Sequence, residues 1–152
     1  IGLSIAYYKR QVRVFGVDNS QIAMKVANIN KDKFNLENVK LYNGDLFSNI
    51  EDGEKFHIIA SNPPYISTGE IQIEVRNFEP VEALDGGEDG LDFYRKIIPN
   101  AKNYLEKNGL LIFEIGFEQG QMVKEIFLKE GFKNIEILKD LQGLDRVVCG
   151  IK

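Results

Sequence analysis

The chain has little of what disulfide-bonded and metal-binding proteins require. It contains one cysteine, Cys149, and one histidine, His57, among 152 residues. A single cysteine excludes an internal disulfide and a thiolate metal cluster, so we expect no structural zinc and no bound metal. His57 lies within an apolar stretch, and no second histidine is available to share a metal or a catalytic triad. We therefore interpret it as a core or edge residue, and Cys149 as a small residue of the core.

The sequence also lacks long apolar runs and an excess of positive charge. No apolar segment approaches the roughly 20 residues that a helix needs to cross a bilayer. Lys and Arg number 19 against 23 Asp and Glu, which gives a net charge of -4, and the basic residues are scattered. We expect a soluble, cytoplasmic protein that uses no membrane. The weak basic field argues against a nucleic acid as the direct substrate.

Short apolar segments alternate with helical patterns along most of the chain. With 43% apolar residues the chain can bury one ordinary core, so we expect a single domain over residues 1–152. The alternation predicts an α/β fold with a mostly parallel, twisted sheet, helices on both faces and ligands at the carboxyl ends of the strands. We expect strands at 12–17, 39–42, 56–60, 110–115, 135–138 and 146–151, and helices at 2–8, 20–33, 91–105 and 119–130.

Three of these elements carry more detailed predictions. We predict that the strand at 56–60 is buried. The last two strands resemble a closing antiparallel hairpin. The helix at 91–105 contains Pro99, which could interrupt it, and Asn108-Gly109 would end it.

Two carboxylates follow the first two expected strands. Asp18 follows the first, where nucleotide-binding α/β folds place a carboxylate that accepts hydrogen bonds from ribose hydroxyls. Asp45 follows the second and could accept a hydrogen bond from an exocyclic amino group such as that of adenine, with Leu46 and Phe47 against the purine. Each has a local alternative: Asp18 could favour the start of a helix, and Asp45 could belong to an Asx turn.

The sequence Asn62-Pro63-Pro64-Tyr65 is the strongest signal in the chain. Two consecutive prolines fix two φ angles, remove two backbone donors and restrain the residue before each of them to extended geometry. The Pro63 carbonyl and the Asn62 side-chain oxygen are then held as rigid acceptors. The alternative is a simple turn that ends the strand.

A pair of rigid acceptors suits an amide or amine nitrogen whose lone pair is delocalised. The acceptors would hold the two N–H groups, aim the nitrogen at a methyl group and stabilise the positive charge that develops. Tyr65 would pack on the flat group and exclude water. No strong base is needed before transfer, because the alkylated nitrogen becomes acidic and releases its proton afterwards. The motif therefore predicts methylation of a planar nitrogen.

Two further features allow more than one interpretation. Glu114 lies near the end of the strand expected at 110–115, where it could line a pocket or bond to nearby backbone. The segment 85–90 carries three acids and lacks the spacing of a calcium site, so we interpret it as a solvated loop.

Over nearly all of its length the chain resembles the catalytic domain of the HemK/PrmC family, the release-factor glutamine N5-methyltransferases. The Asn-Pro-Pro-Tyr motif also occurs in adenine-N6 and guanine-N2 enzymes, so the more specific likeness lies in residues 74–94. The segments that carry it are Val17-Asp18-Asn19-Ser20, Gly44-Asp45-Leu46-Phe47, Ser61-Asn62-Pro63-Pro64-Tyr65-Ile66, Glu74-Val75-Arg76, Phe78-Glu79-Pro80, Ala83-Leu84, Gly86-Gly87-Glu88-Asp89-Gly90-Leu91-Asp92-Phe93-Tyr94, Glu114-Ile115-Gly116 and Leu144-Asp145-Arg146-Val147-Val148.

The resemblance implies a Rossmann-like class I methyltransferase that depends on S-adenosylmethionine. It implies that the motif at residues 62–65 binds the glutamine of a Gly-Gly-Gln tripeptide in a peptide-chain release factor. It also implies that Asp18, Asp45, Leu46 and Asn62 contact S-adenosylmethionine.

The resemblance further implies segments upstream of Ile1. The family's first strand and glycine-rich loop should immediately precede this residue, and a small helical domain that contacts the release factor should precede them. Without the loop the chain should bind the cofactor poorly. The family often has an aromatic residue where Leu46 stands, so adenine packing would rely on Leu46 and Phe47.

Two other functions stay open at this point. One is methylation of a nucleic-acid base, at adenine N6 or guanine N2, against which the acidic balance of the chain stands. The other is a binding module that retains the fold without catalysis.

Overall fold

The structure, a computed structural model, describes residues 1–71 and 80–152. The segments Glu74-Val75-Arg76 and Phe78-Glu79, which carry part of the family resemblance, lie outside the described residues. The chain divides into two compact units: unit 1, residues 1–54, and unit 2, residues 55–152. The expectation of a single domain stays a prediction.

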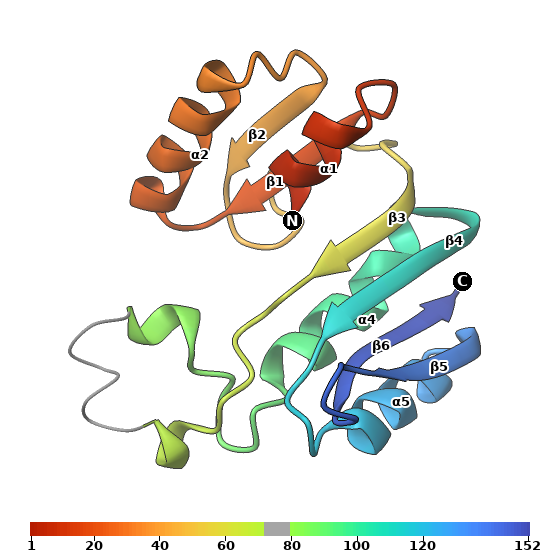
Figure 1. The fold of residues 1–152 in the computed structure, drawn as a ribbon. Helices are drawn as coiled ribbons and strands as arrows, with labels where there is room; N and C mark the ends of the chain where they lie inside the picture. Colours follow the sequence, from red (N-terminus) through yellow and green to blue (C-terminus); the bar gives the residue numbers. More distant parts are fainter. Residues whose placement is uncertain (72–79) are drawn as a thin grey trace. The chain divides into compact units, whose positions relative to one another are not determined.

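Unit 1 consists of two helices and a two-stranded parallel sheet (Figure 1). Ser20 begins the second helix as predicted, because its hydroxyl oxygen accepts a hydrogen bond from the amide of Ala23 at 3.2 Å. The buried core of the unit contains Ala6, Leu36 and Val39. The elements are α1 (Gly2–Tyr8), β1 (Val14–Asp18), α2 (Gln21–Lys33) and β2 (Val39–Asn43).

Unit 2 contains a four-stranded sheet in the order β3-β4-β6-β5. Strands β3 and β4 are parallel, whereas β6 is antiparallel to both of its neighbours. The mixed sheet confirms the predicted α/β fold with an antiparallel C-terminal hairpin. The elements are β3 (Phe56–Ser61), the short 3₁₀ helices η1 (Thr68–Glu70) and η2 (Val81–Ala83), α4 (Asp92–Tyr104), β4 (Leu105–Glu114), α5 (Gly120–Lys129), β5 (Lys133–Lys139) and β6 (Asp145–Ile151).

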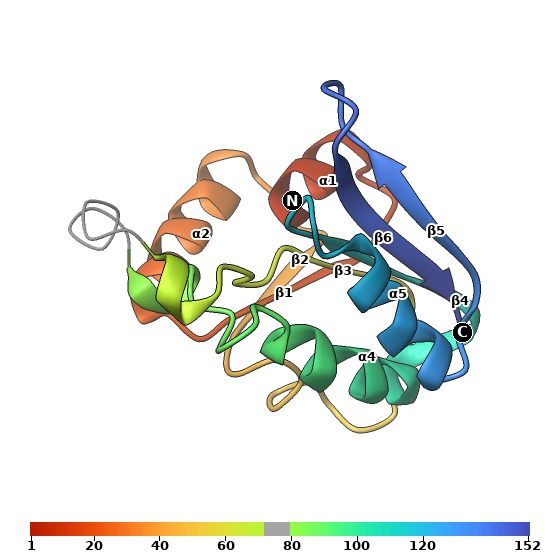
Figure 2. The same ribbon diagram turned by 90° about the horizontal axis from the view of Figure 1, so that it is seen from below.

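A chain of aromatic rings joins the helices of unit 2 to its sheet. Phe113 on β4 meets Tyr94 of α4 edge to face, with ring centroids 5.3 Å apart, and Phe127 of α5 at 5.9 Å. Phe127 continues the chain to Phe132 at 5.0 Å. These contacts hold α4 and α5 on one face of the sheet, where Figure 2 shows them side by side. Such pairs add specific geometry to the burial of large apolar surfaces.

Helices on both faces of the sheet were predicted, but among the described residues of unit 2 the two α-helices, α4 and α5, both lie on one face. Ile59 and Ser61 pair with Leu111 and Phe113, and Phe113 faces α4 and α5. Successive side chains of a strand point to opposite faces, so Ile58 points away from these helices. Its side chain is 60% exposed. His57 and Ala60 are also exposed, so the prediction that this strand is buried is wrong. The physical reason is that, among the described residues of unit 2, the helices α4 and α5 cover the other face of the sheet.

Two single residues of unit 2 clarify the sequence interpretation. His57 is exposed on β3, which confirms an edge residue and excludes a core one. Cys149 is half-buried on β6 rather than part of the core, and partial burial raises the pKa of its thiol.

The structure decides whether Pro99 interrupts α4, and it corrects the predicted start of β4. Pro99 does not interrupt α4, because Tyr94, Ile97 and Ile98 bury one face of the helix and outweigh the missing backbone donor. The helix ends at Tyr104, and β4 begins at Leu105 rather than five residues later. Leu105 is buried and pairs with Phe56, which carries the chain into the sheet before the predicted turn.

The described residues include no helix that is both long and apolar enough to cross a membrane.

Phe113 provides a test of this core. Replacing it with alanine removes a fully buried ring that contacts two others, so we expect the free energy of unfolding to fall by about 3–5 kcal/mol. Leu141→Ala is the control, because Leu141 is fully exposed and its loss should cost less than about 0.5 kcal/mol. Urea unfolding followed by circular dichroism measures both, and equal losses would contradict the assignment of the core.

Candidate active site

In unit 1 the carboxyl ends of two parallel strands bring Asp18 and Asp45 to the same edge. Asp18 is the register partner of Asn43, and the Asn43 side-chain amide donates to the Asp18 carbonyl at 3.0 Å. The amide of Gly44 donates to the same carbonyl at 3.0 Å. The turn that carries Asp45 is therefore fixed to the end of β1, as expected for a ligand site in a parallel α/β sheet.

Both carboxylates at this edge are exposed. One oxygen of Asp18 accepts a hydrogen bond from the amide of Ser20 at 2.8 Å, which leaves its other oxygen available. Ser48 closes the turn by binding the main chain of Asp45: the Asp45 amide donates to the Ser48 hydroxyl oxygen at 3.0 Å, and the Asp45 carbonyl accepts from the Ser48 amide at 2.9 Å. No hydrogen bond from residues 1–71 or 80–152 reaches the Asp45 carboxylate, so this side chain does not form the Asx turn that was its alternative.

Leu46 follows in a left-handed conformation, with φ at +50°. A residue with a β-carbon pays about 1–2 kcal/mol for this geometry. The Leu46 side chain is half-buried.

In unit 2 the motif at residues 62–65 begins directly after β3. Ser61 pairs with Phe113, so the motif lies at the carboxyl edge of β3 and β4, beside Glu114. Asn62 is exposed and Pro63 is buried. Within the described parts of the chain, no group donates a hydrogen bond to the Asn62 side-chain oxygen or to the Pro63 carbonyl. The described residues therefore leave both predicted acceptors unpaired.

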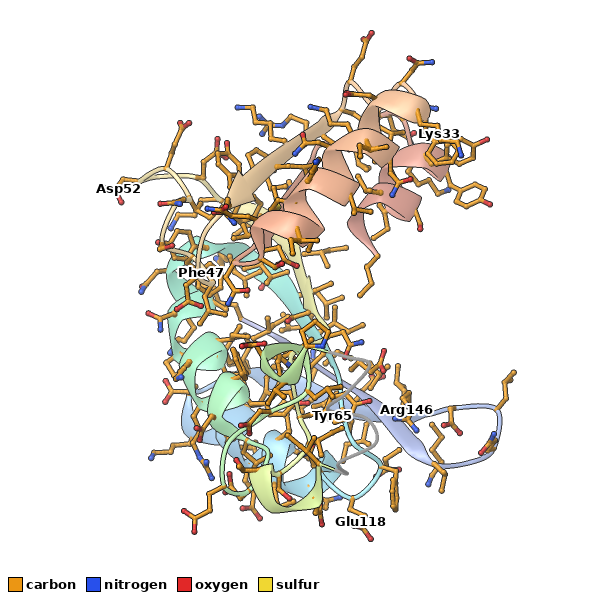
Figure 3. All side chains as sticks on the ribbon, turned by 90° about the vertical axis from the view of Figure 1, so that its left-hand side faces the viewer. Lys33, Phe47, Asp52, Tyr65, Glu118 and Arg146 are labelled. Carbon is orange, nitrogen blue, oxygen red and sulfur yellow. The ribbon has the colours of Figure 1, made fainter. Side chains whose placement is uncertain are left out.

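The residues after the motif are tightly held. The Tyr65 carbonyl accepts a hydrogen bond from the side-chain amide of Gln119 at 2.9 Å. Ile66 forms a bridge with the loop before α4: its amide donates to the Leu84 carbonyl at 3.0 Å, and its carbonyl accepts from the Gly86 amide at 2.8 Å. The backbone at Tyr65 and Ile66, directly after the two unpaired acceptors, is thus held by hydrogen bonds. Figure 3 labels Tyr65 among the side chains of unit 2.

The loop at residues 85–90 provides this anchor. Its acids Glu88 and Asp89 are exposed, which confirms the predicted loop, but Gly86 and Gly90 are buried against the motif. A β-carbon on Gly86 would lie 2.8 Å from the Tyr65 Cα, and one on Gly90 would lie 2.4 Å from the Tyr65 carbonyl oxygen. The sequence interpretation missed this packing role of the glycines.

An ion pair joins the same loop to α4. Arg95 donates hydrogen bonds to both carboxylate oxygens of Asp89, and these bonds hold the pKa of Asp89 below its usual value. The pair is exposed to solvent, so it fixes the loop geometry more than it stabilises the fold.

Tyr94 is a fully buried residue of α4 that contacts the end of β4. Its hydroxyl donates to the Glu114 carbonyl at 3.0 Å, so it is the main chain of Glu114 that is bound. Burial raises the pKa of Tyr94 well above its usual value, and the nearby Tyr65 and Glu114 raise it further. The hydrogen bond places the Tyr94 hydroxyl at the carboxyl end of β4. Whether the Glu114 carboxylate lines a pocket stays open.

Residues 1–78 match the family model described as the methyltransferase small domain. The chain belongs to this methyltransferase family.

Individual relatives agree with this assignment. The chain is 46% identical over 151 residues to a release factor glutamine methyltransferase of Thermodesulfovibrio yellowstonii, covering 97% of this chain and 54% of that protein. It is 48% identical over 157 residues to one of Clostridium acetobutylicum, covering 100% of this chain and 55% of that protein. The chain thus spans about half the length of these relatives. Their names confirm the resemblance that the sequence motifs indicated.

A solved structure confirms the predicted fold class. The crystal structure of a methyltransferase from Pyrococcus furiosus superposes with a TM-score of 0.73 at 18% identity, covering 98% of this chain and 67% of that one. At this level of identity the similarity concerns the fold alone.

The methyltransferase chain holds its predicted site residues in two groups. Asp18, Asp45 and Leu46 share an edge of unit 1, and the motif at 62–65 lies in unit 2. Sequence reasoning missed Gln119, which it placed only at the start of a helix. No sequence pattern identifies a glutamine whose side chain is buried, although its position shortly after Glu114-Ile115-Gly116 placed it near the carboxyl edge of the sheet.

Gly90 tests whether the loop holds the motif. Both Gly90 and Gly143 have positive φ, at +73° and +83°, but an added β-carbon meets the Tyr65 carbonyl only at Gly90 and open space at Gly143. We expect Gly143→Ala to lower the free energy of unfolding by about 1 kcal/mol. Gly90→Ala adds a clash with backbone and should cost several kcal/mol in all, of order 3–5. Urea unfolding of both variants measures the difference, and equal losses would show that Tyr65 is not held here.

Proposed function

We propose that the protein containing this chain transfers a methyl group from S-adenosylmethionine to the side-chain amide nitrogen N5 of glutamine. The substrate is the glutamine of the Gly-Gly-Gln motif in a peptide-chain release factor. The observation that carries the proposal is the available acceptor pair of Asn62 and Pro63, fixed to an anchored Tyr65. Relatives that are 46% and 48% identical and are named for this activity support the choice of substrate.

The residues at the edge of unit 1 fit S-adenosylmethionine. Its ribose hydroxyls and adenine amino group are hydrogen-bond donors, and Asp18 and Asp45 present exposed carboxylate oxygens. Leu46 supplies apolar surface for the purine. The family resemblance implies a cofactor contact for Asn62 as well. When bound, the cofactor supplies an electrophilic methyl group on a sulfonium. The first strand, glycine-rich loop and helical domain that the resemblance implies upstream of Ile1 belong to the same proposal.

The acceptor motif performs three tasks on the glutamine amide. The Asn62 side-chain oxygen and the Pro63 carbonyl each accept one N–H, which orients the nitrogen and stabilises the positive charge that develops on it. The Tyr65 ring covers the flat amide and excludes water. After methyl transfer the nitrogen is acidic and loses a proton to solvent, so no residue of this chain needs to act as a strong base beforehand.

The proposed partner is the release factor itself, a protein of the translation machinery, which places the reaction in the cytoplasm. The net charge of -4 supports a protein substrate rather than a nucleic acid, because a nucleic-acid enzyme gains affinity from a basic surface.

Asn62→Ala tests the acceptor role. Losing one of two groups that stabilise developing charge should reduce kcat by about a hundredfold or more. The fold should be unaffected, because the exposed Asn62 side chain accepts no hydrogen bond from the described residues. The measurement is transfer of labelled methyl from S-adenosylmethionine to purified release factor by the full-length protein. Asn103→Ala is the matched control, since Asn103 is an exposed asparagine on α4. Unchanged kcat in Asn62→Ala would remove this residue from the mechanism.

The same assay tests the substrate. Replacing the glutamine of Gly-Gly-Gln in the release factor should abolish labelling, and labelling that survives this replacement would overturn the proposal. Labelling of DNA or RNA instead of the release factor would favour a nucleic-acid base methyltransferase. If the full-length protein neither binds S-adenosylmethionine in calorimetry nor labels any substrate, the chain is a non-catalytic module.

A further inference from the structure

Gln119 is the one buried polar side chain in the described parts of the chain, with 8% of its surface exposed. It stands immediately before α5, whereas its sequence neighbour Glu118 is exposed and points away from unit 2 in Figure 3. Burial of an amide is costly unless its hydrogen bonds are made. The hydrogen bonds of Gln119 therefore explain how its side-chain amide can be buried.

The Gln119 side chain joins three separate backbone segments. Its oxygen accepts a hydrogen bond from the amide of Gly116 at 2.9 Å, in the segment that leaves β4. Its nitrogen donates to the Tyr65 carbonyl at 2.9 Å and to the Gly90 carbonyl at 3.2 Å. Both donor hydrogens and the acceptor are thus used, and every partner is a main-chain atom.

This arrangement requires a glutamine and a glycine together. A group that both donates and accepts is needed, because the Gly116 amide must find an acceptor while the carbonyls of Tyr65 and Gly90 must find donors. Gly90 leaves room for it: a β-carbon there would lie 2.6 Å from the Gln119 side-chain nitrogen.

The anchored carbonyl of Tyr65 lies two residues after the Pro63 carbonyl. Pro64, between them, has a fixed φ, and the proline pair restrains the backbone before it. Because the φ of Pro64 cannot change, part of any shift of the Tyr65 carbonyl passes to the Pro63 carbonyl. The short path from Gln119 to the acceptor pair is the physical basis of the inference.

We propose that Gln119 is a positioning residue for methyl transfer, which acts through the Tyr65 carbonyl to hold the Asn62–Pro63 acceptor pair at the reacting amide. This inference rests on the proposed function and deepens it. Gln119 itself does not touch the substrate. Its role is to set the direction of the acceptors, and a displacement of about 1 Å at such a group can lower the rate a hundredfold.

Gln119→Glu separates the acceptor role of Gln119 toward Gly116 from its donor role toward Tyr65 and Gly90. The carboxylate keeps an acceptor for Gly116 and places negative charge at the start of α5, which favours the helix, so we expect the variant to fold. In its ionised form, however, it turns an oxygen instead of a donor toward the carbonyls of Tyr65 and Gly90. Gln121→Glu makes the same charge change at an exposed position of α5 and is the matched control.

The experiment uses the full-length protein, labelled S-adenosylmethionine and release factor. Calorimetric stoichiometry of cofactor binding counts the folded sites in each variant, and activity is expressed per folded site. At a pH of about 8 we expect kcat/KM of Gln119→Glu for the release factor to fall about tenfold to a hundredfold, with unchanged cofactor affinity. Gln121→Glu should match the wild type.

The pH profile provides a readout that a merely structural role would not change. Below the pKa of the carboxyl group that Gln119→Glu introduces, which burial raises, the acid can again donate to the Tyr65 carbonyl. Activity of Gln119→Glu relative to wild type should therefore recover as the pH falls to about 6. Gln119→Leu has no donor at any pH, so its relative activity should stay low and flat. Nearby titratable groups, namely Tyr65, Glu114, Glu118 and Asp145, are present in every variant, so their effects cancel in the ratio.

The outcomes separate the two proposals. If the wild type labels the glutamine while Gln119→Glu retains full activity per site, the positioning role is overturned and the proposed function stands. Equal losses in Gln119→Glu and Gln119→Leu without recovery at low pH, or loss of cofactor stoichiometry in both, would also overturn it, because Gln119 would then only support the fold. If the wild type does not label the glutamine, the proposed function fails and the inference fails with it.

Discussion

The organisation of unit 2 depends on the removal of backbone donors at the end of β3. Pro63 and Pro64 cannot donate hydrogen bonds, so the chain leaves the sheet through a segment that offers only acceptors. A segment without backbone donors forms few hydrogen bonds of its own. Other residues must therefore donate hydrogen bonds to the backbone that follows it. Gln119 and the loop before α4 supply them, at Tyr65 and Ile66. The proline pair and the buried Gln119 amide therefore depend on each other: the first removes backbone donors, and the second supplies a donor at Tyr65.

Much of this architecture could be predicted from the sequence because it rests on local rules. The start of the helix at Ser20 and the alternation of apolar segments with helical patterns act over a few residues, and these predictions were confirmed. The acceptor motif was predictable for the same reason, since proline geometry does not depend on distant contacts. Its position directly after a strand followed from the apolar residues that precede it.

What could not be predicted depends on contacts between segments far apart in the chain. The exposure of Ile58 depends on which face of the sheet the helices cover, and the early start of β4 depends on the pairing of Leu105 with Phe56. The role of Gln119 depends on two partners 54 and 29 residues away. A single sequence gives no sign of such pairings, because a buried glutamine and an exposed one look alike.

The loop of residues 85–90 combines fixed and free positions. Gly86 and Gly90 are committed to the backbone of the motif, whereas Glu88 between them is exposed. A reporter group attached at position 88 would therefore sit within two residues of the anchor without replacing any part of it. The protein thus offers a natural attachment point for a spectroscopic probe, from which the arrival of a protein substrate could be followed directly.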